Sequence, residues 1–190
     1  MFTENRHIAN KPNATYVTLI ACSAALGGFL FGFDTAVING AVGALQRTFN
    51  ASSAMIGFAV SSGLLGSALG AFIAGPIADR QGRIKTMIVA SILFTLSAIG
   101  SGNPFGIWDF IFWRALGGIA VGMASVIAPA YIAEVAPAHL RGRLGSLQQM
   151  AIVVGIFIAL LSDYFIALGA GGTAEGQFWF GVTAWRWMFW

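Results

Sequence analysis

The chain has 190 residues, of which 57% are hydrophobic and only 9% are charged, and its formal net charge is +3. A soluble globular domain carries about 25% charged residues. A soluble core of this size could not hide so many apolar side chains, so the composition indicates that lipid is part of the solvent. The single cysteine, Cys22, excludes a disulfide or zinc framework. Its place inside an apolar run predicts a small core side chain.

Five long apolar runs predict membrane-spanning helices. They cover residues 14–38, 54–78, 86–102, 108–133 and 144–168. A sixth run begins near Phe178 and reaches Trp190, and its length of about 13 residues is too short to cross a bilayer. We therefore predict an all-α integral membrane bundle over residues 16–190, with five full transmembrane helices and the start of a sixth, within which the chain is cut off. Residues 1–15 are expected to form a polar cytoplasmic tail.

The placement of lysine and arginine predicts the orientation of the bundle. One set of helix ends holds seven basic residues, namely Arg6, Lys11, Arg80, Arg83, Lys85, Arg141 and Arg143. The opposite connections hold Arg47, and Arg186 lies at the edge of the last run. The N-terminus is therefore expected in the cytoplasm of a multi-pass protein of the cell inner (plasma) membrane. Because the basic residues separate apolar runs instead of forming a patch on a polar surface, a nucleic-acid partner is excluded.

Glycines recur at a spacing that suits close helix packing. Three pairs lie four residues apart on the predicted first, second and fourth helices: Gly28/Gly32, Gly66/Gly70 and Gly118/Gly122. Small residues at this spacing let helix backbones approach closely in lipid. We expect packing within the bundle, with dimerisation as the alternative. These glycines do not form a dinucleotide-binding fingerprint, because no strand precedes them.

The segment 75–83 has the pattern GxxxDRxGR, and two chemical roles follow from it. Gly75 and Pro76 are expected to end one helix, and Asp79 is expected to cap the first N–H groups of the next. Arg80 and Arg83 are then free to pair with acids of neighbouring loops. We expect them to form a charge cluster with Asp79, Glu134 and Arg141 that holds one conformation closed. The alternative is that the arginines only set the orientation.

The ionisable residues Asp34 and Arg114 lie inside apolar runs. Asp34 stands about 6 Å from the predicted end of the first helix, and Arg114 stands about 9 Å into the fourth helix from the same side. Charges inside a membrane are costly and usually face a partner or a water-filled cavity. Matching depths predict that Asp34 and Arg114 pair with each other. The alternative is an interfacial aspartate and a snorkelling arginine.

A second motif identifies a family. The pattern PxYxxExxPxxxRG is formed by Pro129, Tyr131, Glu134, Pro137, Arg141 and Gly142, and it continues into Leu147-Gln148-Gln149. Together with the GxxxDRxGR loop, it resembles the sugar porter family of the major facilitator superfamily, and most closely the bacterial D-xylose–proton symporters. The resemblance covers the chain from the first helix to the WRWMF segment near its end.

The resemblance implies roles for four residues. In proton-coupled members, the matching Asp34 and Arg114 form the proton-coupling pair, whereas passive carriers have asparagine at the position of Asp34. The matching Gln149 contacts the sugar, and Phe31 matches an aromatic residue that lines the same cavity. An interhelical hydrogen bond is the alternative role for Gln149. Ile156 departs from the xylose carriers, which have a second amide there.

The resemblance also implies what the chain lacks. Sugar porters have twelve helices, and the missing C-terminal six-helix half supplies most of the sugar contacts. We expect this chain to be the N-terminal part of a monosaccharide (pentose or hexose)–proton symporter working by alternating access, and to transport nothing alone. The alternatives are a non-transporting membrane sugar sensor and a uniport-type facilitator. The sequence shows no nucleophile–base pair and no metal-ligand spacing, so an enzyme, a metal and a cofactor are not expected.

Overall fold

The computed structural model describes residues 14–190, and these residues are almost entirely helical. The predicted tail, with Arg6 and Lys11, lies outside the described residues except for residues 14 and 15, which belong to the first helix. The elements in chain order are α1 (Ala14–Thr48), α2 (Ser53–Gln81), α3 (Arg83–Gly102), α4 (Ile107–Val135), α5 (Arg141–Gly169), the 3₁₀ turn η1 (Trp179–Gly181) and α6 (Ala184–Phe189).

Five helices of the described chain are long and apolar enough to cross a membrane. The three 29-residue helices α2, α4 and α5 each extend about 44 Å at 1.5 Å per residue, more than the roughly 30 Å of hydrocarbon in a bilayer. Large apolar side chains such as Leu65, Phe72, Phe157 and Phe165 are exposed along these helices. An apolar surface of this kind is stable against lipid or a further protein layer and not against water, so the predicted membrane-protein class is confirmed.

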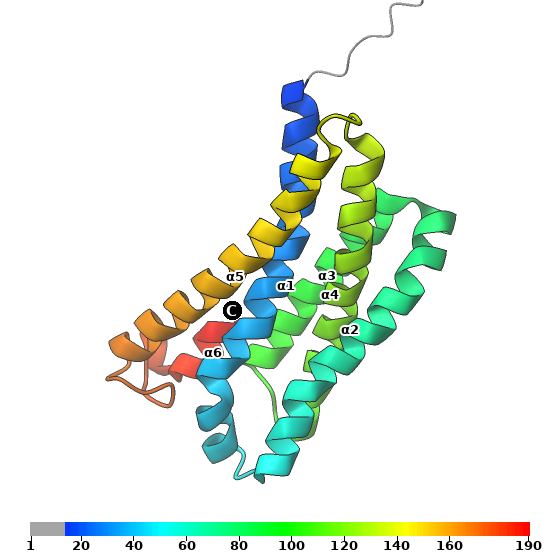
Figure 1. Cartoon of the computed structure of the whole chain (residues 1–190). Coiled ribbons are helices and arrows are strands. Elements are labelled where there is room, and N and C mark those ends of the chain that lie inside the picture. The colour runs from blue at the N-terminus through cyan, green and yellow to red at the C-terminus, as the bar shows by residue number, and fades with distance from the viewer. Residues whose placement is uncertain (1–13) are drawn as a thin grey trace, which may run out of the picture.

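The bundle is built from two long helix pairs that meet in its centre. Helix α5 runs along α1, and α2 runs along α4, as Figure 1 shows. Helix α3 packs against α4, and α1 contacts α4 between the two pairs. The short α6 lies against α1, α3 and α5. We call the end that holds the α2–α3 and α4–α5 connections the basic end, and the end that holds the α1–α2 and α3–α4 connections the opposite end.

The predicted glycine packing is confirmed in both helix pairs. In the α2–α4 pair, a Cβ atom added at Gly66 or Gly70 would collide with the backbone of α4, and one added at Gly118 or Gly122 would collide with the backbone of α2. In the α1–α5 pair the same holds for Gly32 against Ile152. Each glycine therefore lets two helix backbones touch, which in lipid replaces the missing hydrophobic force between helices.

Helix α1 is longer than the apolar run predicted. It was expected to end near Ile38, but it continues to Thr48. The added turns bury Ala41, Ala44 and Leu45 in a core shared with α4, α5 and α6. Tertiary burial of these small side chains keeps the segment helical past Asn39 and Gly40. Cys22 is exposed, so the prediction of a core side chain was wrong.

The connection between α2 and α3 also differs from its prediction. Pro76 lies inside α2, which continues to Gln81, and the chain turns at Gly82, where φ is +90°. Glycine adopts this conformation without the strain that a Cβ would introduce. Asp79 belongs to the last turn of α2, and among the described residues no side chain caps the start of α3. The predicted capping role of Asp79 was wrong.

The sixth helix starts later than predicted. The residues after Phe178 form the turn η1, in which Phe180 has a φ of 57°, and Gln177 and Thr183 make an isolated antiparallel bridge. Helix α6 begins only at Ala184. Aromatic contacts explain the turn: Phe178 stacks on Trp179, and Trp187 of α6 packs edge-on against both rings.

The two glycines Gly70 and Gly57 give a matched test of the packing within α2. Gly70→Ala places a methyl group against the Ile119 carbonyl, whereas a Cβ at Gly57 meets nothing within 4 Å. We expect Gly70→Ala to destabilise the bundle by about 1–3 kcal/mol through overpacking. Gly57→Ala should be neutral or stabilise it by up to about 1 kcal/mol. Unfolding in detergent, followed by circular dichroism, measures both, and equal unfolding curves would contradict the packing.

Candidate functional site

A buried ion pair joins α1 to α4 at the centre of the bundle. The Arg114 Nη1 atom donates to Asp34 Oδ1 at 2.5 Å, and Nη2 donates to the Asp34 backbone carbonyl at 3.4 Å. The Arg114 side chain is only 4% exposed and that of Asp34 is 14% exposed. The guanidinium also lies over the Phe189 ring of α6, 5.8 Å from its centroid. The structure therefore brings together the two residues that the sequence predicted to pair.

The predicted pairing is present although the depth argument behind it was wrong. The first helix was predicted to end at Ile38, but α1 ends at Thr48, so Asp34 lies about 21 Å from that end at 1.5 Å per residue. Arg114 lies about 10 Å from the start of α4. The two residues meet because α1 extends well past the start of α4 at the opposite end of the bundle.

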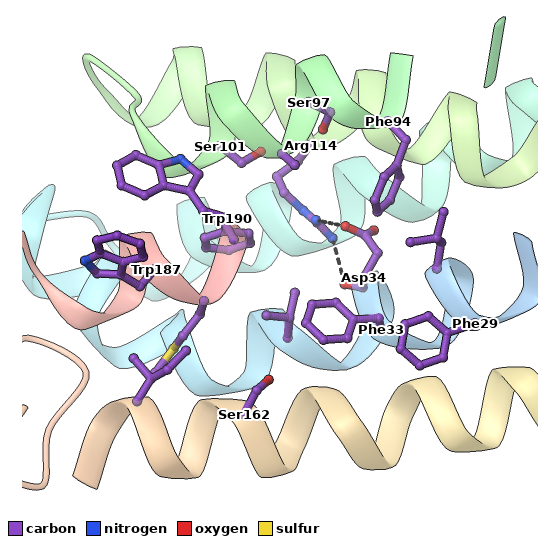
Figure 2. Close-up of a pocket in the computed structure, with 16 residues that line it drawn as sticks. Phe29, Phe33, Asp34, Phe94, Ser97, Ser101, Arg114, Ser162, Trp187 and Trp190 are labelled. Carbon is purple, nitrogen blue, oxygen red and sulfur yellow. Dashed lines mark hydrogen bonds and ion pairs between the residues drawn. The ribbon is translucent and has the colours of Figure 1, made fainter. Parts of the chain in front are cut away.

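A cavity of about 310 Å³ adjoins the ion pair on one side. Figure 2 shows Asp34 and Arg114 between the aromatic rings of Phe29 and Phe33 on α1 and of Trp187 and Trp190 near the chain end. The hydroxyl groups of Ser97, Ser101 and Ser162 belong to the same lining. A space of this size is large enough for several water molecules, and the ion pair and the serine hydroxyl groups would be their polar partners. The Asp34 carboxylate therefore borders a cavity that could admit water.

A smaller cavity of about 70 Å³ adjoins the ion pair on the other side, between α1, α2 and α4. Its lining includes Phe31 and Thr35 together with Asp34 and Arg114. Gly63 of α2 leaves room for the guanidinium, because a Cβ there would lie 3.3 Å from Arg114 Nη2. The ion pair thus separates two cavities, and Phe31, the predicted sugar-lining residue, belongs to the smaller one.

Gln149, the predicted sugar contact, lies on an exposed face of α5, whereas Gln148 is buried. Gln148 faces α1, where its backbone carbonyl and side chain contact Gly28. Within the part of the chain that the structure describes, the Gln149 amide makes no hydrogen bond to another helix, so the alternative role is not seen there. Gln149 lies outside both cavities around the ion pair. Its exposed amide is available to a ligand or to a further protein segment.

Ion pairs at the basic end involve three of the five residues of the predicted cluster. Arg83 Nε donates to Glu134 Oε1 at 3.1 Å, and Arg83 Nη1 donates to Asp79 Oδ1 at 3.0 Å. The pair with Glu134 connects α3 to the last turn of α4. Arg80 and Arg141 are exposed and lie outside the ion pairs of the described residues. The cluster in this conformation is therefore centred on Arg83.

Sequence reasoning passed over one buried ionisable residue, Asp163 of α5. It lies in the predicted apolar run 144–168, yet its side chain is ionisable and only 5% exposed. Neither carboxylate oxygen has a hydrogen-bond partner among residues 14–190. A lone acid inside a membrane helix was the signal that could have marked it, because intramembrane ionisable residues usually have a function.

Comparisons with known proteins identify the family. A family model described as “Sugar (and other) transporter” matches residues 20–190. The glucose transport protein of Synechocystis is 75% identical over 178 residues, covering 94% of this chain and 38% of that protein. The D-xylose-proton symporter of Escherichia coli K12 is 37% identical, over 93% of this chain and 40% of that protein.

A solved structure agrees with the sequence matches. The major facilitator superfamily proton:xylose symporter XylE, bound to 6-bromo-6-deoxy-D-glucose, matches with a TM-score of 0.84 and 37% identity, over 93% of this chain and 42% of that chain. The chain thus spans about two fifths of the length of the relatives it matches. The matched range and the helical arrangement together show that this chain belongs to the sugar transporter family of the major facilitator superfamily.

Proposed function

We propose that the chain forms the N-terminal part of a sugar–proton symporter that works by alternating access. The buried Asp34–Arg114 pair is the observation that carries the proposal. A passive carrier has no need for a titratable acid beside a buried guanidinium, and a sensor has no need to exchange protons. The relatives named as proton symporters for xylose and arabinose support proton coupling.

The sugar we propose is a monosaccharide, with glucose as the first to test. The glucose transport protein of Synechocystis shares 75% identity with this chain. Gln149 would bind sugar hydroxyls through its amide, which offers both donors and an acceptor. Phe31 would line a sugar cavity that is completed by the other half of the transporter, because neither cavity beside the ion pair includes Gln149. The C-terminal half of a complete transporter would supply the remaining contacts. The proposed setting is the inner membrane with the N-terminus in the cytoplasm, because basic residues collect at one end of the bundle.

The proposed coupling step is a change in the charge of Asp34. A proton that enters from the 310 Å³ cavity beside the pair neutralises the Asp34 carboxylate, and the ionic attraction to Arg114 is lost. Arg114 keeps only its weak contacts to the Asp34 carbonyl and the Phe189 ring. The link between α1 and α4 then loosens, and the bundle can rock against the other half of the transporter. Proton release restores the pair.

The Asp34 role can be tested in a chimera that replaces the matching segment of the Synechocystis glucose transport protein with residues 1–190. We expect the chimera to accumulate glucose against a gradient and Asp34→Asn to abolish accumulation while keeping glucose exchange. Asp109→Asn, which changes a half-buried acid in the first turn of α4, should behave like the parent. Vesicles holding residues 1–190 alone should take up no sugar. Continued accumulation by Asp34→Asn would remove the proposed role.

The Gln149 role has a matched neighbour in Met150, which is also exposed. In the chimera, Gln149→Ala should raise the glucose concentration at half-maximal exchange about tenfold, because one hydrogen-bonding group of the site is lost. Met150→Ala should change it by less than about twofold. If Gln149→Ala matches Met150→Ala, the amide does not bind sugar.

The Arg83 cluster is proposed to act as a gate at the basic end. Its ion pairs are partly exposed, so each contributes about 1 kcal/mol or less. Glu134→Gln should shift the balance between inward- and outward-open states by about two- to fivefold toward opening at the basic end. Arg83→Gln and the double variant should shift the balance in the same direction by at least as much, because both also remove the Arg83–Asp79 pair.

Cysteine labelling measures this shift in a Cys22→Ser background. Ser146→Cys lies on the Gln149 face of α5 near the basic end, and Asn39→Cys lies on the Phe31 face of α1 nearer the opposite end. In Glu134→Gln, labelling at residue 146 should become faster and labelling at residue 39 slower. Unchanged labelling at both positions would reject the gate.

A further inference from the structure

Asp163 is a second buried acid, on a helix and in an interface that the Asp34–Arg114 pair does not use. It lies in α5, six residues before the helix end at Gly169, and its side chain faces α1 at Gly40. A Cβ atom at Gly40 would lie 2.7 Å from Asp163 Cγ. The carboxyl group therefore rests directly on the backbone of α1, in a space that exists only because residue 40 has no side chain.

The surroundings of Asp163 offer it no opposite charge. On α1, Asp34 is paired with Arg114, and Arg47 is paired with Glu175 in the loop after α5. On α6, Arg186 donates to Asn103 and lies over the Trp185 ring. Tyr164, the neighbour of Asp163 on α5, is exposed. None of the ion pairs between described residues includes Asp163.

Burial without a partner decides the charge state of this acid. Moving an isolated carboxylate from water into a low-dielectric interior costs several kcal/mol, and groups in that position are neutralised instead. Both Asp163 oxygens are closed to solvent and have no hydrogen-bond partner within residues 14–190. The neutral carboxylic acid avoids the cost of the charge, and its O–H group is able to donate to a nearby backbone carbonyl.

We propose that Asp163 is a second proton-binding site of this protein, separate from Asp34 and occupied in the conformation seen here. Proton binding converts the carboxylate to the acid and lets α1 and α5 close at Gly40. Proton loss requires water to reach the carboxyl group, so it requires these two helices to part. Ser162, the residue beside Asp163, lines the 310 Å³ cavity that also holds Asp34. This cavity provides the route by which the proton would leave.

Infrared spectroscopy of the 190-residue chain in lipid nanodiscs tests the proposal without any transport measurement. A protonated carboxyl group has a C=O stretch outside the amide region. At neutral pH the chain should show such a band, and it should shift when aspartate is labelled with ¹³C, because Asp163 is the unpaired buried aspartate among the described residues. A spectrum without a protonated aspartate band would overturn the proposal, and this wild-type measurement needs no variant to fold.

Variants then assign the band to its residue. Asp163→Asn, which keeps the shape of the side chain, should remove the band, and Asp109→Asn should keep it. Gly40→Ala forces a methyl group against the carboxyl group, so it should admit water and reduce the band. Gly43→Ala, on the same helix with nothing within 4 Å of its Cβ, should leave the band unchanged. A band that survives Asp163→Asn would contradict the assignment.

A role for this proton in transport rests on the proposed symport, whereas the protonation itself does not. The infrared result and the Asp34→Asn accumulation result are therefore independent. Suppose that Asp163 is protonated and the Asp34→Asn variant still accumulates sugar. These results would refute the proposed coupling through Asp34, and they would still support the second proton-binding site.

Discussion

A guanidinium group buried inside a membrane bundle needs a negative partner, and this requirement ties the fold together. Arg114 is almost completely enclosed, and Asp34 on another helix is its counter-ion. Removing one partner of such a pair leaves an uncompensated buried charge, which costs about 3–5 kcal/mol in typical cases. The pair thus holds α1 against α4, and in the proposed mechanism the strength of this central contact depends on whether Asp34 binds a proton.

The rest of the bundle supplies the geometry that this contact needs. Glycine-mediated backbone packing fixes α1 to α5 and α2 to α4 as two long pairs. Under an inverted repeat of three helices, which is known in major facilitator halves, the first helix corresponds to the fourth and the second to the fifth. The two tight pairs therefore correspond to each other, and the ion pair joins the two equivalent helices. The glycine contacts within each pair involve no titratable side chain except Asp163 at Gly40 and Arg114 at Gly63, whereas the link between the pairs is itself an ion pair.

The sequence was sufficient for the helix count, the glycine packing and the meeting of Asp34 with Arg114. Each of these follows from a strong local signal: a long apolar run, a four-residue glycine spacing or a charge inside an apolar segment. The positions of the helix ends were harder to predict from the sequence. Burial of Leu45 extends α1 past Gly40, and Gly82, with its positive φ, ends α2 in place of Pro76. Contacts of Phe178 and Trp179 with Trp187 delay the start of α6, and the apolar pattern of the sequence does not reveal them.

Two features of the site lay beyond the sequence for a related reason. The sequence predicted Asp79 and Glu134 as the acids of the cluster, but only the fold shows that Arg83 contacts both and that Arg80 and Arg141 lie outside the ion pairs of the described residues. In the sequence, Asp163 is one polar residue within an apolar helix. Its burial depends on contact with Gly40, which lies 123 positions earlier in the chain. Contacts between residues so far apart in the sequence require the packed helices to be known.

The most direct measurement of the central claim is proton movement driven by sugar. Vesicles that contain the chimera, weakly buffered and held without a membrane potential, receive external glucose while the external pH is recorded. If Asp34 and Arg114 couple the two fluxes, the addition of glucose makes the outside solution more alkaline, and the change disappears with a protonophore. Glucose entry at a constant external pH would contradict the account, because sugar would then cross without a proton.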